Sequence, residues 1–425
     1  MHRLSALILF CILFMLTSCE DEDGFYAPVI VFSEPLADDV IKLPDTIDVK
    51  VQISSDHTII SVMLTLVNLD KIPVIGGTYF FPDSTDFYLE TSLPLVDKNL
   101  ESGPYKLLVT VSDGSNQKNM YRQIIIHEVP VQLKEYIAVT GQISFQSTIA
   151  RLNPAFETDT QFVISDGYWL AAVHSRWEKF FFVTREPSTL IALDPESFEQ
   201  EWEMAAEPPR PLFTGLMCDK ELVFSTANGD AGVLSSGGIV ILRTAPRQDK
   251  TIQCLAADDQ YIYASSVSLS GDIRELTIIY RVSGSVRDEK LISGEIRSLI
   301  PAAGNVLVFL QIPSGTRILE YVPNDLIITE LKLIQDETLQ SAVKISEEQL
   351  LLLTENRVIS YNLSLNQLNV FKDQSYHFCR YDNLSDIVFL VRYNMIYGFD
   401  RISGDLKVEK SFPEEVLDFQ IVYNK

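Results

Sequence analysis

Short apolar runs separated by turn residues recur from about residue 131 to the C-terminus. The clearest copy spans residues 179–204 and contains an apolar strand, a short turn, a second strand, a D-P-x-S turn and an alternating third strand. Runs that are apolar on both faces are typical of strands covered on both sides by neighbouring sheets. Because the copies follow one another at intervals of about 40 residues, they predict a repeat architecture such as a solenoid or a β-propeller.

The copies align on two consecutive strands, which we take as the second and third strands of each repeat. The second strands are expected at residues 180–183, 222–225, 261–264, 306–309, 350–353 and 387–390, and the third strands at residues 190–193, 239–242, 278–280, 318–321, 358–361 and 395–399. These segments define six blades.

A seventh blade is expected to be divided between the two ends of this region. Residues 135–140 match the second strand of the repeat, residues 148–153 match the third, and residues 416–423 supply the missing first strand. The sequence therefore predicts a seven-bladed β-propeller closed by its C-terminal strand, an arrangement without a free sheet edge. No fourth strand is evident between Thr244 and Cys254 in the third repeat, so six or eight blades are alternatives.

Residues 27–130 show a different pattern, in which short alternating strands are separated by turn residues. The β-branched residues Ile47, Val49, Val51 and Ile53 alternate with polar ones and would share one face of a strand. Such alternation is typical of an antiparallel β-sandwich. The fold class expected for the whole chain is therefore all-β, with a β-sandwich followed by the propeller.

Local motifs in both regions resemble known families. Residues 102–114 read S-G-P-Y-K-L-L-V-T-V-S-D-G and resemble the penultimate strand and turn of bacterial immunoglobulin-like modules. Residues 193–197 and 399–404 resemble turns of bacterial propellers of the pyrroloquinoline-quinone-like and WD-repeat-like kind, although the first lacks the usual glycine. These resemblances imply an immunoglobulin-like spacer over residues 27–130 and a propeller over residues 131–425. They imply fold rather than activity, and no cofactor is expected.

The N-terminus has the pattern of a bacterial lipoprotein signal. Arg3 precedes an apolar run over residues 6–16, and Leu16-Thr17-Ser18-Cys19 follows, which resembles the lipobox. The apolar run is too short for a transmembrane helix, so residues 1–18 are expected to be a cleaved signal peptide. Acylation of Cys19 with several chains would anchor the protein stably to a membrane.

An acidic tether is expected over residues 19–26. Its residues Glu20, Asp21, Glu22 and Asp23 resemble the export tag behind the acylated cysteine of surface-exposed lipoproteins in the Bacteroidota. A solvated linker would have the same composition. As a whole, the chain resembles Bacteroidota surface lipoproteins that carry an N-terminal immunoglobulin-like module and a C-terminal β-propeller.

Charge and cysteine content narrow the classes of partner. Fifty-eight acidic residues against 34 basic ones give a net charge of −24, which disfavours nucleic acid and anionic lipid headgroups as partners. The three cysteines beyond the signal region, Cys218, Cys254 and Cys379, form no C-x-x-C pair. We therefore expect buried thiols and no structural zinc site.

The sequence contains no recognisable catalytic motif. It has no G-x-S-x-G, H-E-x-x-H, P-loop or EF-hand pattern. His174 and His377 are expected in first strands of the propeller, with one blade between them. They could form a metal or catalytic pair, but structural roles are favoured for both, and no metal site is expected.

Two long loops give the only clue to a binding site. Residues 228–237 and 266–275 are expected to join second to third strands on the same face of the propeller, which the linker at residues 207–211 also approaches. Elaborated loops on a rigid scaffold often carry function, although insertions without a role are equally compatible with the pattern. The candidate binding residues are Arg210, Asn228, Asp230, Ser235, Ser268, Asp272 and Arg274.

These observations favour a protein anchored by lipid in the outer membrane and facing the cell exterior. Its propeller would be a non-catalytic platform for another envelope protein or a glycan. One alternative is a polysaccharide lyase or hydrolase acting at the channel mouth. Another is a periplasm-facing factor for outer-membrane assembly.

Overall fold

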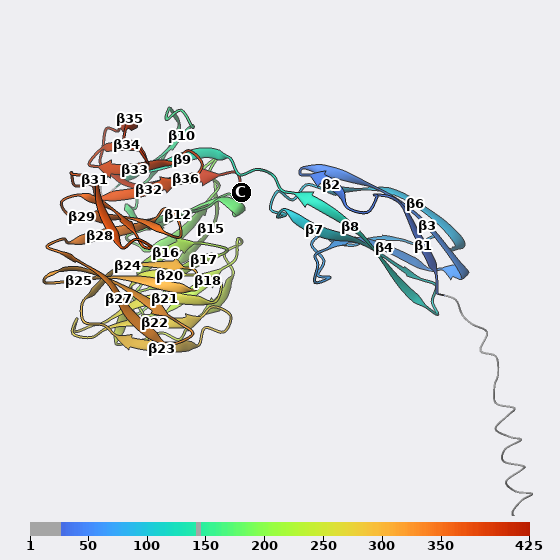
Figure 1. Cartoon of the computed structure of the whole chain (residues 1–425), viewed down its shortest axis with the longest axis horizontal. Helices are drawn as coiled ribbons and strands as arrows, with labels where there is room; N and C mark the ends of the chain where they lie inside the picture. Colours follow the sequence, from blue (N-terminus) through green and yellow to red (C-terminus); the bar gives the residue numbers. More distant parts are fainter. Residues whose placement is uncertain (1–26, 142–145) are drawn as a thin grey trace, which may run out of the picture. The chain divides into compact units, whose positions relative to one another are not determined.

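The computed structural model describes residues 27–141 and 146–425 (Figure 1). Cys19 and the acidic tether therefore lie outside the described residues. The chain divides into two compact units, Met1–Pro130 and Val131–Lys425. Regular structure in the described residues is β-strand apart from a 3-10 turn at Ser175–Trp177. None of their helices is long and apolar enough to cross a membrane.

The first unit consists of two sheets that share one core. Its strands are β1 (Val29–Glu34), β2 (Asp39–Lys42), β3 (Asp45–Ile59), β4 (Ser61–Val67), β5 (Thr78–Phe80), β6 (Ser84–Leu95), β7 (Gly103–Ser112) and β8 (Gln117–His127). They form the sheets β1-β3-β6 and β2-β8-β7-β4-β5. Val49 and Val51 of β3 and Val109 of β7 are fully buried in the common core, as the alternation along these strands predicts.

The second unit contains seven four-stranded antiparallel sheets in its described residues. Numbered in chain order, sheet 1 is β36 (Val416–Tyr423), β9 (Leu133–Gly141), β10 (Ser147–Leu152) and β11 (Thr158–Ile164); sheet 2 is β12 (Tyr168–His174), β13 (Lys179–Thr184), β14 (Thr189–Leu193) and β15 (Gln200–Ala205); sheet 3 is β16 (Phe213–Cys218), β17 (Leu222–Thr226), β18 (Ala231–Leu234) and β19 (Val240–Arg243); sheet 4 is β20 (Lys250–Ala257), β21 (Tyr261–Ser268), β22 (Arg274–Tyr280) and β23 (Val286–Leu291). Sheet 5 is β24 (Glu295–Ala302), β25 (Asn305–Ile312), β26 (Gly315–Val322) and β27 (Ile327–Gln335); sheet 6 is β28 (Leu339–Lys344), β29 (Gln349–Thr354), β30 (Val358–Asn362) and β31 (Gln367–Lys372); sheet 7 is β32 (Phe378–Asp382), β33 (Ile387–Arg392), β34 (Met395–Asp400) and β35 (Leu406–Ser411).

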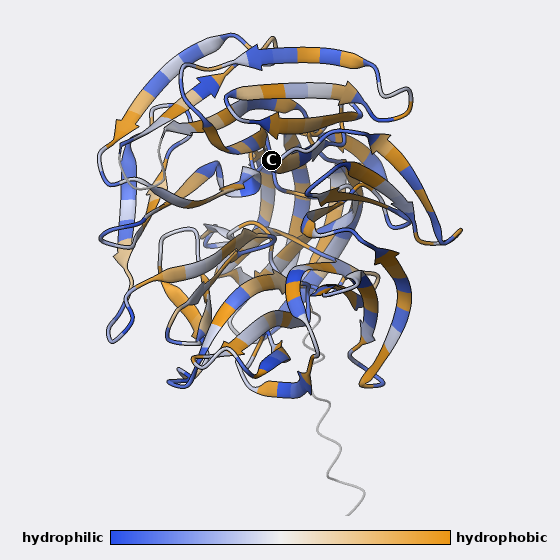
Figure 2. Cartoon of the chain, turned by 90° about the vertical axis from the view of Figure 1, so that its left-hand side faces the viewer, coloured by the Kyte–Doolittle hydropathy of each residue, from blue (hydrophilic) through white to orange (hydrophobic). Residues whose placement is uncertain are grey.

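The sheets follow one another around a ring of first strands. We call β36, β12, β16, β20, β24, β28 and β32 the first strands, because each forms one edge of its sheet. Each first strand contacts the next, and β36 contacts both β32 and β12. The C-terminal strand β36 pairs antiparallel with β9, as the sequence predicts, with Phe419 opposite Ala138. In Figure 2 the inner strands are largely hydrophobic, whereas strands at the periphery alternate between hydrophobic and hydrophilic residues.

Each sheet contributes apolar side chains to two cores, one on either side. In β13, Phe180 and Phe182 join the core shared with sheet 1, whereas Phe181 and Val183 join the core shared with sheet 3. All four side chains are fully buried. Removing a side chain of this size from water is worth roughly 1.5–3 kcal/mol. This two-sided burial is why the second strands read as continuous apolar runs in the sequence.

The third repeat differs from the sequence prediction. Its third strand is β18 (Ala231–Leu234), and the segment expected as the third strand forms the fourth strand β19. A Cβ atom on Gly232 would lie 2.5 Å from the ring of Phe224 on the paired strand, so a larger residue there would force the ring to move. Ala231 and Gly232 shorten the apolar run of β18 to Val233 and Leu234, which hides the strand from a search for apolar runs. The long loop expected at residues 228–237 therefore does not exist.

The loop expected at residues 266–275 is also shorter than predicted. Strand β21 continues to Ser268 and strand β22 begins at Arg274, so only residues 269–273 connect them. Ser266 pairs with Glu275, and Val267 pairs with Arg274. Most of the expected loop is therefore an extension of the hairpin.

Candidate functional site

Six of the seven first strands carry a β-bulge near their start. In β12, Tyr168 pairs with Thr184 and Leu170 pairs with Val183, which leaves Trp169 as the extra residue. The extra residues of the other five strands are Thr214, Gln253, Arg297, Gln340 and Leu417. A bulge of this kind changes the direction of one side chain without breaking the sheet. Six of the seven sheets therefore present one redirected residue near the start of the first strand.

The residue before the extra position is buried in the core in five of the six strands, whereas in β12 it is the half-buried Tyr168. Phe213, Ile252, Ile296, Leu339 and Val416 are at most 3% exposed. In sheet 7, buried Tyr376 precedes exposed His377, and the His377 N–H donates to the carbonyl of Val391, the residue opposite Phe378 (3.0 Å). His377 thus occupies the corresponding position in sheet 7. A buried residue therefore precedes this position in six of the seven first strands and gives the redirected residues a rigid base.

Five redirected residues converge on one depression of about 470 Å³. They are Trp169, Thr214, Gln253, Arg297 and Gln340, from sheets 2 to 6. We call this depression the mouth, because it lies where the first strands begin. Its volume falls in the range of small-molecule sites, about 300–1,000 Å³. The mouth is the candidate functional site of the second unit.

The mouth combines an oriented indole with two unengaged amides. Trp169 donates its Nε1–H to the carbonyl of Phe213 (2.7 Å), and the guanidinium of Arg185 lies 5.3 Å from the indole ring centre. The side chains of Gln253 and Gln340 are exposed and hydrogen-bond to no described residue. Each amide offers two donors and one acceptor oxygen. The mouth can therefore make several directed hydrogen bonds beside an aromatic surface.

The charged groups of the mouth are paired with each other, and its thiol is held protonated by burial. Arg297 pairs with Glu295 on the same strand, at 3.0 Å between Nη2 and Oε2. Burial raises the pKa of the Cys254 thiol to about 11, and its Sγ lies 3.4 Å from the carbonyl oxygen of Ile296. A thiol with such a pKa is protonated at neutral pH and is a poor nucleophile. The mouth is therefore equipped to hold a ligand.

The structure does not bring His174 and His377 together. His174 is the last residue of β12, whereas His377 precedes β32 at the end where the first strands begin. His174 is buried, stacks on Trp177 at 3.9 Å, and burial lowers its pKa. The His377 Nε2 lies 3.1 Å from the carbonyl oxygen of Val416. The two imidazoles therefore lie at opposite ends of the first strands. No group of three His, Cys, Asp or Glu in the described residues could hold a metal ion.

Three of the predicted binding residues form a structural network instead. The Arg210 N–H donates to Asn228 Oδ1 (3.1 Å), and the Asn228 amide donates to the carbonyl of Glu207 (2.8 Å). Asp230 is fully buried and accepts from the Arg243 Nε–H (2.6 Å). Asn228 and Asp230 are thus occupied in fixing the β17–β18 turn. The expectation that they lie on a long loop is wrong, and both are buried.

The other predicted binding residues lie in two separate turns. Ser235 accepts from the Ile239 N–H (3.2 Å) at the end of β18 away from Asp230. Ser268 accepts from the Ile273 N–H (3.0 Å), and this turn also contains Asp272 and leads to Arg274. The structure therefore does not gather the seven predicted residues into one surface. No sequence motif indicates the residues of the mouth, because they combine an indole, a hydroxyl, a guanidinium and two amides.

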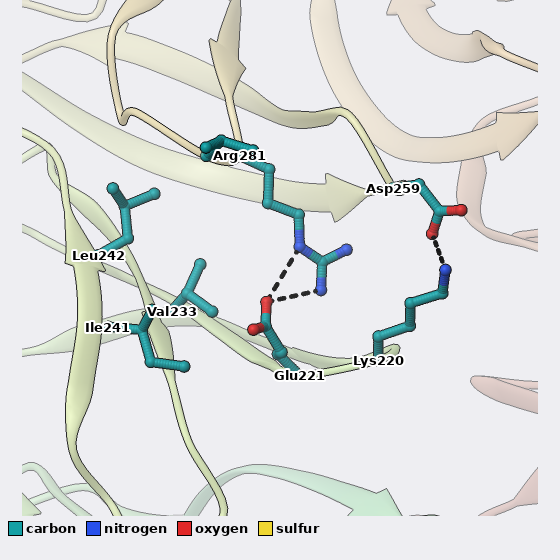
Figure 3. Close-up of a pocket in the computed structure, with 8 residues that line it drawn as sticks. Lys220, Glu221, Val233, Ile241, Leu242, Asp259 and Arg281 are labelled. Atoms are coloured by element: carbon teal, nitrogen blue, oxygen red, sulfur yellow. Dashed lines mark hydrogen bonds and ion pairs between the residues drawn. The ribbon is translucent and has the colours of Figure 1, made fainter. Parts of the chain in front are cut away.

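A second cavity of about 500 Å³ lies between sheets 3 and 4, where their second strands begin. As Figure 3 shows, Val233, Ile241 and Leu242 face Arg281 across it. Arg281 pairs with Asp219 (2.8 Å) and Glu221 (3.2 Å), and Lys220 pairs with Asp259 (2.8 Å). Its charged groups already satisfy one another, so the mouth is the stronger candidate.

Comparison with known proteins identifies a fold rather than a family. No protein-family model and no curated protein sequence matches the chain. A structure of the dihydro-heme d1 dehydrogenase NirN in complex with DHE is 11% identical over 74% of this chain and 73% of that chain, with a TM-score of 0.50. A quinoprotein alcohol dehydrogenase-like protein from Bacteroides thetaiotaomicron is 12% identical over 94% of this chain and 100% of that chain, with a TM-score of 0.49.

A β-propeller domain of Cps50 (Swd1) from Myceliophteria thermophila is also similar, at 13% identity over 60% of this chain and 88% of that chain, with a TM-score of 0.46. At these identities the similarity concerns the fold alone. The cyclic order of four-stranded sheets defines the second unit as a β-propeller within an all-β chain.

Proposed function

We propose that this chain is a lipid-anchored envelope protein whose propeller is a non-catalytic binding platform, with the mouth as its binding site. The observation that carries the proposal is the convergence of bulged residues from five sheets on one depression. Bulges are commonly placed beside functional sites, where they redirect a side chain. A repeated bulge whose extra residue differs from sheet to sheet is suited to specific recognition.

The chemistry of the mouth supports binding rather than turnover. A general acid or base needs a proton-transferring group held ready for the substrate. Here the carboxylate of Glu295 is paired with Arg297, and the thiol of Cys254 is held protonated by burial. The amides of Gln253 and Gln340 are unengaged, and amides bind but do not transfer protons.

The proposal includes a specific architecture for both units. The seven sheets and the cyclic contacts of their first strands support a seven-bladed propeller closed by β36. The two sheets around a common core support an immunoglobulin-like β-sandwich in the first unit, which would act as a spacer. A spacer would hold the mouth away from the membrane to which Cys19 is attached.

Anchoring and location rest on the lipobox and the acidic residues 20–23. We propose that Cys19 is acylated and that the protein sits in the outer membrane facing the cell exterior. Labelling cells with a fatty acid probe should mark the wild-type protein and not Cys19→Ser. Proteinase K added to intact cells should degrade it. Complete protection from the protease would contradict surface display and favour a periplasm-facing protein.

Affinity capture with the detergent-extracted full chain tests the binding function. We expect the wild-type protein to retain an envelope protein or a glycan, and Gln253→Ala with Gln340→Ala to lose it. The matched control is Gln260→Ala, because Gln260 is an exposed glutamine in the β20–β21 turn at the other end of the strand that carries Gln253. Equal capture by all three forms would place the binding site elsewhere. Release of products from polysaccharides by the wild-type protein would contradict the non-catalytic proposal.

A further inference from the structure

We infer that the ligand of the mouth is an uncharged oligosaccharide; this inference rests on the proposed binding function and names its ligand class. The first argument is charge. Glu295 and Arg297 are the charged side chains that line the mouth, and they form one ion pair. In a chain with a net charge of −24, the lining of the mouth is therefore balanced in charge, and Arg185 lies next to it against the Trp169 ring. An anionic or cationic ligand would have to compete with this pair or lie against one member of like charge.

The hydrogen-bonding groups around Arg297 match hydroxyl groups. Gln253 and Gln340 stand on the strands of the two neighbouring sheets, so an amide flanks the ion pair on each side. A sugar hydroxyl can donate to one group and accept from another at the same time. It can therefore accept from Arg297 while donating to Glu295, and bond with the amides in either direction. A ligand that only donates or only accepts hydrogen bonds could not bond with both members of the ion pair as well as the two amides.

Trp169 supplies the surface for the apolar face of a sugar ring. It belongs to sheet 2, whereas the ion pair belongs to sheet 5, so both line the same depression from different sheets. The bond from its Nε1–H to the Phe213 carbonyl fixes the orientation of the indole. The electron-rich system of an indole attracts the positively polarised C–H groups on the less polar face of a pyranose. An indole on one wall and hydrogen-bonding groups on another suit an amphipathic ring.

The decisive experiment measures which saccharides bind the full chain. The probes are hexasaccharides of β-glucose, β-xylose and β-mannose as neutral ligands, and hexagalacturonate as the acidic one, measured by titration calorimetry at 50 and 500 mM NaCl. We expect a neutral probe to bind with little dependence on salt, because screening acts on charges. Gln253→Ala with Gln340→Ala should weaken it at least 10-fold, and Gln260→Ala should leave it unchanged.

Trp169→Phe and Trp169→Ala add a graded test of the indole, with the smaller side chain weakening binding more. Since Trp169 also packs between sheets 2 and 3, the thermal unfolding of each variant must be measured alongside. The glutamine variants change exposed side chains and do not depend on this check.

Three results would overturn the inference. Salt-sensitive binding of hexagalacturonate alone would show an acidic ligand. Retention of a protein partner that depends on Gln253 and Gln340, with no saccharide bound, would show a peptide ligand. In both cases the mouth remains a binding site and the proposed function stands. If Gln253→Ala with Gln340→Ala changes neither the affinity capture nor saccharide binding, the proposed function is contradicted as well.

Discussion

The hydroxyl of Tyr168 donates a hydrogen bond of 2.6 Å to Oδ2 of Asp418, a residue 250 positions further along the chain. Tyr168 begins the first strand of sheet 2, and Asp418 lies in the C-terminal strand that completes sheet 1. Arg380 of sheet 7 reaches the same carboxylate, at 3.6 Å. Asp418 is 3% exposed, and burial raises its pKa. One buried carboxylate thus ties three neighbouring sheets together where the two ends of the propeller meet.

Tyr168→Phe should therefore destabilise the propeller. The substitution removes a hydrogen bond to a buried acceptor, which costs about 1–3 kcal/mol of the free energy of unfolding. Chemical unfolding followed by tryptophan fluorescence measures the effect. Tyr393→Phe is the matched control, because the Tyr393 side chain is exposed and its loss should change stability by less than about 0.5 kcal/mol. Equal stability of the two variants would show that the contact does not hold the closure.

Glu135 should make stability depend on pH. It is buried, and burial raises its pKa to about 7 despite Arg151 at 3.7 Å, which acts in the opposite direction. A folded-state pKa above the unfolded value means that the native state binds the extra proton between about pH 4.5 and 7. The contribution of Glu135 to stability is therefore present at low pH and is lost as the pH rises to 7.

Glu135→Gln should remove this loss. Relative to the wild-type protein, we expect the variant to be equal near pH 4 and more stable at pH 8 by about 1–3 kcal/mol. Unfolding in urea at a series of pH values measures the difference between the two proteins, and Glu199→Gln, at an exposed position in the β14–β15 turn, should show no such trend. A constant difference from pH 4 to 8 would mean that Glu135 does not titrate in this range.

Cys254 offers a direct probe of the mouth. Since its pKa is raised to about 11, only a small fraction is thiolate at pH 8, and its alkylation by iodoacetamide should be roughly 100-fold slower than that of an ordinary thiol. The rate, read by mass spectrometry of the labelled peptide, should rise steadily between pH 8 and 10. A ligand bound in the mouth should slow it further, because Cys254 lines the depression. Rapid labelling at pH 7 would contradict the burial of this thiol.

The sequence predicts the repeat well because two-sided burial leaves a strong signal. The expected strands at residues 180–183 and 190–193 are confirmed as β13 and β14, and the pairing of residues 416–423 with β9 is also confirmed. The apolar runs arise from the cores on both sides of each sheet. A run of consecutive apolar residues can be recognised without knowing the direction in which each side chain points.

The mouth could not be predicted in the same way. A bulge adds one residue and leaves no mark on hydrophobicity, and the extra residues include an indole, a guanidinium and amides. The available signal was a buried residue followed by a variable one and then a small one, as in residues 213–215 and 339–341. Recognising it requires the strands of each repeat to be placed correctly, and in sheet 3 the predicted third strand lies one strand too far along the chain because Ala231 and Gly232 lack apolar bulk.

Gly232→Ala tests whether the missing side chain is a requirement of packing. Its Cβ would lie 2.5 Å from the Phe224 ring, and overpacking of this kind costs about 1–3 kcal/mol. Because the two closest atoms belong to the Phe224 ring and the next, the Leu242 carbonyl oxygen, lies at 3.0 Å, Phe224→Leu should reduce the cost of Gly232→Ala in part when the two are combined. A double-mutant cycle of unfolding free energies measures this coupling. Gly237→Ala is the control, since a Cβ there has no atom within 4 Å and should be neutral or slightly stabilising. If Gly232→Ala behaves like Gly237→Ala, the small residues of β18 are not needed to seat Phe224.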